Sequence, residues 1–144
     1  MTWSAPSPKA QAVVEAFDTN VVVRLIVRDD EGQCRLAAEA FRKAVASGGA
    51  WMASVVLVEV SWVLRVAYKF DRATIAAALR RLCATEGVRL EDSAMTELAL
   101  SAYEKGPADF SDFFILESAR RNGALPLRTF DAQLSRADGA KLVE

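Results

Sequence analysis

Short apolar stretches that alternate with longer segments of helical periodicity most constrain the fold of this chain. The stretches lie at 13–17, 51–53, 87–90, 124–129 and 141–143. Their short length and apolar content are typical of strands. Between them, apolar residues recur at helical spacing, as at Ile75, Ala78, Leu79 and Leu82. Since parallel strands need long crossover connections, which are usually helical, the alternation predicts an α/β fold, a three-layer α/β/α sandwich with a short parallel sheet.

Turn and cap residues indicate where the predicted helices begin and end. Asp18 and the two residues after it start the first helix, and Gly106-Pro107 ends the helix expected from residue 93. The apolar run 51–64 is too long for an ordinary strand. It therefore predicts a short strand followed by a buried helix that Ser54 caps.

Length and composition indicate one ordinary domain. The chain has 144 residues, of which 52% are hydrophobic and 26% charged, and no linker is evident after residue 12. We expect a flexible tail over 1–11 and a single domain over 12–144. No stretch resembles a signal peptide or a membrane span, which predicts a cytoplasmic protein.

The absence of histidine excludes several kinds of site. Ser-His-Asp and Cys-His nucleophiles and imidazole-based zinc sites cannot be built from this sequence. Cys34 and Cys83 are isolated from each other, so we expect reduced, buried thiols. The formal net charge of −1 means that a polyanionic ligand must be bound locally or through a cation.

Acidic residues interrupt or follow the most apolar segments. They are Asp18, Glu59, Asp112 and Asp131, with Asp109 nearby. Asp18 and Asp131 each follow a predicted strand, so we expect them at one edge of the sheet, where α/β folds bind ligands. Each has a structural alternative: Asp18 and Asp109 as helix caps, and Asp131 as a turn residue.

Glu59 is the acid that is hardest to explain structurally. It stands alone in a run of apolar residues, where an unpaired carboxylate would cost several kcal/mol. We therefore expect it to be paired, either with an arginine such as Arg65 or with a metal ion.

Carboxylates without histidine or thiolate are typical of a site for a hard cation. Mg²⁺ and Mn²⁺ prefer oxygen ligands, and such an ion can orient a scissile phosphate and activate water. The pattern favours hydrolysis of a phosphodiester bond, with Glu59 or Asp131 able to orient the water.

Four segments in order resemble the acidic motifs of PIN-domain ribonucleases, and within them of the VapC-type toxins of toxin–antitoxin pairs. They are Phe17-Asp18-Thr19-Asn20, the run from Ser54 to Leu64 around Glu59, Ala108 to Ile115 around Asp112, and Leu127 to Asp131. The resemblance runs from about Val13 to the C-terminus.

The resemblance implies a Mg²⁺- or Mn²⁺-dependent endoribonuclease, usually a homodimer, that acts on RNA and is inhibited by a small antitoxin protein. It assigns Asp18, Glu59, Asp112 and Asp131 as catalytic residues and metal ligands. Asp109, Thr19 and Thr129 are auxiliary. Arg128 departs from the usual pattern and either contacts substrate phosphate or pairs with an acid.

Two other functions fit an acidic pocket at a sheet edge. A non-catalytic interaction module or receiver-like domain needs a lysine in the pocket, whereas Lys43, Lys69 and Lys105 fall in predicted helices or at their ends. A phosphatase with an aspartate nucleophile requires Asp-x-Asp after the first strand, and Asn20 occupies the third position.

Overall fold

Two helices lie between each successive pair of the first four strands along the described chain. The structure is a computed structural model that describes residues 2–3 and 12–144, so most of the predicted tail over 1–11 lies outside the described residues. In chain order the elements are β1 (Val14–Ala16), α1 (Thr19–Ile26), α2 (Glu31–Ala46), β2 (Gly49–Met52), α3 (Ser54–Val66), α4 (Arg72–Ala84), β3 (Val88–Leu90), α5 (Ser93–Lys105), α6 (Phe110–Arg121), β4 (Leu127–Thr129), the 3-10 helix η2 (Leu134–Arg136) and β5 (Ala140–Leu142).

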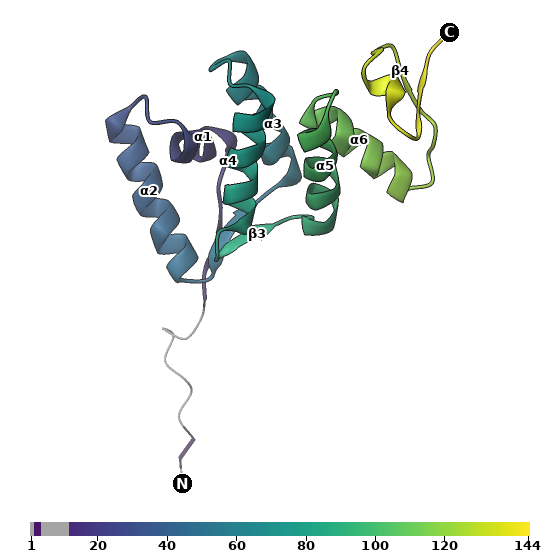
Figure 1. Cartoon of the computed structure of the whole chain (residues 1–144). Helices are drawn as coiled ribbons and strands as arrows, with labels where there is room; N and C mark the ends of the chain where they lie inside the picture. The colour runs from purple at the N-terminus through teal and green to yellow at the C-terminus, as the bar shows by residue number, and fades with distance from the viewer. Residues whose placement is uncertain (1, 4–11) are drawn as a thin grey trace.

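A small parallel sheet forms the centre of the fold. Its strand order is β1-β2-β3, and both pairs run parallel. Helices separate its strands in sequence and pack around it (Figure 1). The predicted α/β sandwich is therefore confirmed.

The last two strands stand apart from that sheet. Among the described residues, β4 and β5 pair only with each other, in parallel, and lie beyond α6, away from β3 (Figure 1). Leu134, between them, is only 4% exposed and belongs to the core. Its packing anchors this C-terminal part away from β1. The expectation that Asp18 and Asp131 share one sheet edge is therefore wrong for the single chain.

The hydrophobic core draws on the apolar faces of the helices and on β2. Ala50 and Met52 are fully buried, as are Leu57, Val60 and Leu64 on one stripe of α3. These α3 positions follow helical spacing, so the long apolar run 51–64 is indeed a strand followed by a helix.

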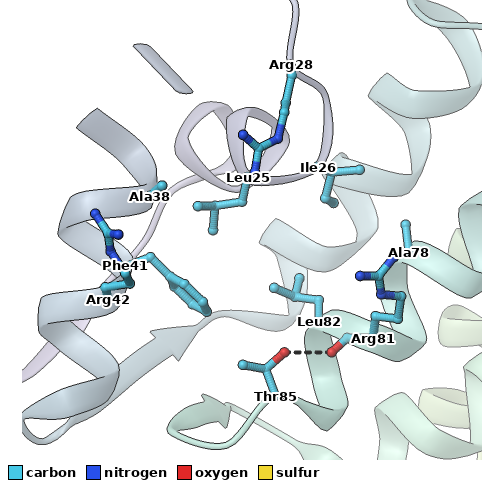
Figure 2. Close-up of a pocket in the computed structure, with 10 residues that line it drawn as sticks. All are labelled: Leu25, Ile26, Arg28, Ala38, Phe41, Arg42, Ala78, Arg81, Leu82 and Thr85. Atoms are coloured by element: carbon cyan, nitrogen blue, oxygen red, sulfur yellow. Dashed lines mark hydrogen bonds between the residues drawn. The ribbon is translucent and has the colours of Figure 1, made fainter. Parts of the chain in front are cut away.

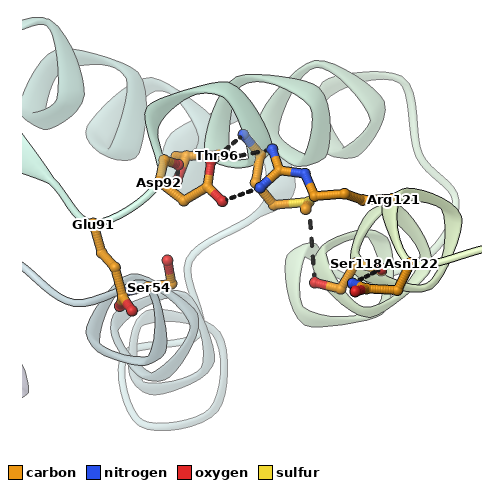
Figure 3. A network of polar contacts seen from close by, with 8 residues as sticks. Ser54, Glu91, Asp92, Thr96, Ser118, Arg121 and Asn122 are labelled. Carbon is orange, nitrogen blue, oxygen red and sulfur yellow. Dashed lines mark hydrogen bonds and ion pairs between the residues drawn. The ribbon is translucent and has the colours of Figure 1, made fainter.

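An ion pair ties the end of α6 to the start of α5. Arg121 pairs with Asp92, which also caps α5 by accepting from the backbone N–H of Met95 (Figure 3). Nearby, Glu91 Oε1 accepts from the backbone N–H of Ser54 at 2.9 Å. The prediction that Ser54 caps α3 is therefore wrong: Ala53 is the N-cap residue, and Glu91 satisfies a free N–H of the first turn.

Candidate active site

Two predicted site residues meet at the first turn of α6. Asp109 is the N-cap residue and Asp112 occupies the third helical position, where its Oδ2 accepts from the backbone N–H of Asp109 at 3.1 Å. The cap role of Asp109 agrees with the structural alternative predicted for it from sequence. The positive end of the helix dipole stabilises negative charge here, so it favours both carboxylates at this position.

Asp131 lies close enough to Asp112 for their charges to interact. Burial is the main cause that raises the pKa of Asp112, and the charges of Asp109 and Asp131 raise it further. The backbone hydrogen bond from Asp109 and the charge of Arg65 act in the opposite direction. Asp109, Asp112 and Asp131 are called the acidic cluster below.

The loop after β4 fixes Asp131 in position. Its N–H donates to Thr129 Oγ1 at 2.9 Å, and its Oδ1 accepts from the backbone N–H groups of Gln133 at 2.7 Å and Leu134 at 3.3 Å. Thr129 therefore orients the backbone of Asp131. The turn role considered for Asp131 from sequence is present, and its Oδ2 takes no part in these bonds.

Asp18 caps α1 at the carboxyl end of β1. Its Oδ1 accepts from the backbone N–H of Val21 at 3.1 Å, and Thr19 begins the helix beside it. The exposed Asp18 side chain also lines a cavity of about 340 Å³ between α1 and α2, together with Asn20, Arg24 and Gln33. The capping bond uses one carboxylate oxygen and leaves Oδ2 available to a ligand.

Glu59 is exposed on α3, which contradicts the expectation of a buried, paired carboxylate. The physical reason is helical periodicity: Val56, Leu57, Val60 and Leu64 turn inward, whereas Glu59 falls outside this buried stripe. Arg65, the arginine considered as its partner, instead lies 3.5 Å from Asp109 Oδ2. Glu59 therefore needs no partner to be stable there.

The predicted site residues are not all brought together in the single chain. The acidic cluster lies at α6 and the loop after β4, whereas Asp18 lies at β1 and Glu59 on α3. Within residues 2–3 and 12–144, no three acidic or sulfur side chains are near enough to one another to hold a metal ion. The donor chemistry still fits a hard cation, because all donors are carboxylate oxygens and Arg65 offsets only part of the negative charge around Asp112.

Two arginines near the acidic cluster were missed in the sequence as contributors to the site. Arg65 balances Asp109. Arg72, at the start of α4, donates to the backbone carbonyls of Tyr103, Pro107 and Ala108 and so fixes the turn before α6. No local pattern in the sequence predicts these contacts. Arg65 lies 44 positions from its partner Asp109, and Arg72 lies at least 31 positions from its partners.

A second cavity of about 440 Å³ lies between α1, α2 and α4. Figure 2 shows Leu25, Phe41 and Leu82 around its interior and the guanidinium groups of three arginines around it. Those arginines are Arg28, Arg42 and Arg81. No acidic residue is among the lining residues, so this groove combines an apolar floor with positive charge.

Comparison with protein families decides the assignment of this fold. A model of the PIN domain matches residues 16–140. The chain belongs to the PIN-domain family. The match covers all four segments that carry the acidic motifs, so the family predicted from sequence is confirmed.

Among solved structures, this PIN domain is similar to VapC20 of Mycobacterium tuberculosis, a sarcin-ricin loop cleaving toxin. The two are 17% identical, the similarity covers 90% of this chain and 98% of the other, and the TM-score is 0.42. A search of curated proteins finds no match. None of the helices in the described part of the chain is long and apolar enough to span a membrane.

Proposed function

We propose that this PIN domain is a metal-dependent endoribonuclease that hydrolyses phosphodiester bonds in RNA. The observation that carries the proposal is the acidic cluster at α6, in which burial and neighbouring charges raise the pKa of Asp112. A cluster of carboxylates with this electrostatic cost is typical of a functional site rather than of a stabilising one. The family assignment and the oxygen-only donor set support the same function.

Asp18, Glu59, Asp112 and Asp131 are the proposed ligands of Mg²⁺ or Mn²⁺ and the proposed catalytic residues. When bound, such an ion offsets phosphate charge and lowers the pKa of a coordinated water. Asp109 and Thr129 hold Asp112 and Asp131 in place, and Thr19 is the proposed auxiliary residue beside Asp18. Glu59, exposed and unconstrained, is suited to accept a proton from the attacking water.

Cleavage of a structured RNA by the purified protein tests this proposal. Wild type should cleave with Mn²⁺ or Mg²⁺ and not after chelation, and Asp18→Asn should cleave at least about 100-fold more slowly, in line with the loss of a group needed in the transition state. Asn keeps the capping oxygen, so the fold is preserved. Equal cleavage by wild type and variant would refute the role of Asp18.

The proposed biological role is that of the toxin in a type II toxin–antitoxin system, acting in the cytoplasm. The motif pattern from Phe17 to Asp131 supports it. The groove of Figure 2 supports a protein antitoxin, because an apolar segment with acidic flanks would match its floor and its three arginines. We also propose that the domain begins near residue 12.

Expression in bacteria tests the toxin role. Wild type without an antitoxin should arrest growth, and Asp112→Ala should abolish the arrest at equal protein level. A small reading frame next to this gene should encode a protein that restores growth. Harmless expression of soluble wild type would contradict the toxin role.

A further inference from the structure

One edge of β1 carries backbone groups that no strand in the described part of the chain pairs with. Toward β2, the Val13 carbonyl accepts from Gly48 at 2.9 Å and the Phe17 N–H donates to the Trp51 carbonyl at 3.0 Å. Because successive residues of a strand turn their backbone groups to opposite sides, Val14 and Ala16 direct theirs to the open edge. An open edge of this kind is a template for another strand.

The surface beside this edge is apolar. Val13 is 56% exposed and Val14 44%, and all three residues of β1 are exposed. A three-residue strand with valines in water and free backbone donors is unfavourable for a monomer. The edge therefore needs a partner.

β4 presents a matching open edge. Toward β5, Leu127 N–H donates to the Gly139 carbonyl at 2.7 Å, and the Thr129 carbonyl accepts from Val143 at 2.8 Å. Arg128 between them therefore turns its N–H and C=O outward. A sheet of two short strands is marginal by itself, so β4 also gains from a neighbour.

The C-terminal arm, residues 124–144, is held away from β1 of its own chain. Ala124 N–H donates to the Ala119 carbonyl at 2.8 Å, and Arg120 Nη2 donates to the Asp138 carbonyl at 2.7 Å. Leu134 anchors the arm in the core. Figure 1 shows the arm beyond α6. While these contacts persist, the edge of β1 is open to the arm of another molecule.

We propose that two copies of this chain exchange their arms, so that β4 of each pairs in parallel with β1 of the other. The parity of the backbone groups and full overlap of the two three-residue strands select the register with Glu15 beside Arg128. In that register, Val14 N–H meets the Pro126 carbonyl, Arg128 N–H meets the Val14 carbonyl, Ala16 N–H meets the Arg128 carbonyl, and Phe130 N–H meets the Ala16 carbonyl.

Side chains agree with this register. Glu15 and Arg128 are both exposed and carry opposite charges, which favours a cross-strand pair. Val14 falls beside Leu127, so apolar residues meet. The exchange is reciprocal and leaves neither edge open, as a closed two-fold dimer requires.

The exchange also joins the two separated parts of the candidate site. The same register places Asp18, three residues beyond Glu15, level with Asp131, three residues beyond Arg128. Asp131 of one copy then lies at the carboxyl end of β1 of the other, beside Asp18. This consequence rests on the proposed function, whereas the exchange itself rests on the open strand edges and the side chains beside them.

The mass in solution tests the exchange without reference to activity. Light scattering of the wild type, a chain of 15.7 kDa, should give a dimer of about 31 kDa, since two-fold dimers close the interface. Val14→Pro removes only an open-edge N–H and should give a folded monomer by circular dichroism, whereas Val14→Thr should stay dimeric. A monomeric wild type, with the arm closed on its own β1, would overturn the exchange.

Charge reversal provides a second test that needs no proline. Glu15→Arg and Arg128→Glu should each weaken the dimer at least about tenfold, because like charges then face each other across the strands. The double variant should restore the wild-type dissociation constant. The register would be contradicted if both single variants dimerise with the wild-type dissociation constant. It would also be contradicted if the double variant dimerises no more tightly than the single variants.

Mixing two inactive chains tests the shared site. Asp18→Asn and Asp131→Asn should each be inactive alone. When the two variants are refolded together, half of the dimers contain one chain of each. In such a mixed dimer, one of the two sites has both wild-type acids. Cleavage should therefore recover to about a quarter of the wild-type rate. No recovery with an active wild type would overturn the shared site. An inactive wild type would refute the proposed function, while the mass measurement would still decide the exchange.

Discussion

The guanidinium group of Arg72 holds the carbonyl oxygen of Ala108, directly before the acidic start of α6. Nη1 donates to this oxygen at 2.6 Å and to the Tyr103 carbonyl at 3.1 Å, and Nη2 donates to the Pro107 carbonyl at 2.7 Å. The guanidinium carbon also lies 4.7 Å from the centre of the Tyr103 ring. One side chain from α4 therefore positions the turn that directs Asp109 and Asp112.

Arg72→Lys should lower the free energy of unfolding by about 1–2 kcal/mol, because an ammonium group cannot reproduce the planar fork of donors. RNA cleavage should fall further than the loss of folded protein explains, since Asp109 and Asp112 lose their fixed position. Urea denaturation and cleavage of RNA by the folded protein measure the two effects. Arg35→Lys, an exposed change on α2, is the control; equal effects of both variants would contradict the positioning role.

Asp112→Asn should stabilise the protein at neutral pH. Burial, and then the charges of Asp109 and Asp131, raise the folded-state pKa of Asp112 above its ordinary 3.8. The folded carboxyl thus binds its proton more tightly than the unfolded one, so stability falls as the pH rises through this window. Asparagine removes this cost and keeps an oxygen for the Asp109 N–H.

Thermal unfolding measured from pH 3 to pH 7 tests this linkage. The difference between Asp112→Asn and wild type should be largest at pH 7 and should approach zero toward pH 3, below the ordinary pKa of 3.8, where the Asp112 carboxyl is protonated in both the folded and the unfolded state. Glu86→Gln, at an exposed position, should show no such trend. A variant that is less stable than wild type at pH 7 would disprove the electrostatic cost.

Glu59→Gln should leave the stability within about 0.5 kcal/mol of wild type, because the side chain is exposed on α3. Cleavage should nevertheless fall by at least about 100-fold if the carboxylate acts on the attacking water. Denaturation and cleavage on the same preparation separate these outcomes. A gain of several kcal/mol would show instead that Glu59 is buried.

Asp18→Ala should cost about 1 kcal/mol of stability, whereas Asp18→Asn should cost little, because asparagine can still accept from Val21 N–H. Both variants should lose cleavage equally, since both remove the charge. Equal stability of the two variants would contradict the capping role. Residual cleavage by Asp18→Asn alone would indicate that the capping oxygen, not the charge, is what matters.

Both thiols should react slowly in the folded protein. Burial raises the pKa of Cys83 from 9.0 to about 11, which lowers its thiolate fraction at pH 8 about 100-fold. Cys34 is buried and its thiol donates to the Val27 carbonyl at 3.2 Å. Alkylation followed by mass spectrometry should therefore label both cysteines only after unfolding, and rapid labelling of Cys83 at pH 8 would contradict this.

The order of strands and helices could be predicted from sequence because periodicity and caps are local. Asp71, Asp92 and Asp109 cap helices where the chain changes from loop to helical spacing. The helical spacing also predicts an exposed position for Glu59. The apolar residues on both sides of Glu59 indicated a buried position instead. A charge inside an apolar run is informative only after its helical face is assigned.

Which of the acidic residues lie close together could be predicted only in part from sequence. Asp109 and Asp112 are neighbours on one helical turn, so their sequence spacing brings them together. Whether Asp131 lies beside Asp18 depends on which strand β4 pairs with, and on the contacts of Arg120 and Leu134 that hold the arm. Such long-range packing leaves no periodic signal in the sequence.

Metal-dependent cleavage by Asp112→Asn tests whether the Asp112 carboxylate is needed for cleavage of RNA with a divalent cation. A single-turnover rate on structured RNA is measured against Mn²⁺ concentration for wild type, Asp112→Asn and the exposed control Glu86→Gln. We expect saturable, Mn²⁺-dependent cleavage for wild type and control, and at least about a 1000-fold lower rate for Asp112→Asn despite its higher stability. Cleavage by wild type that persists without divalent cations, or that Asp112→Asn retains, would contradict it.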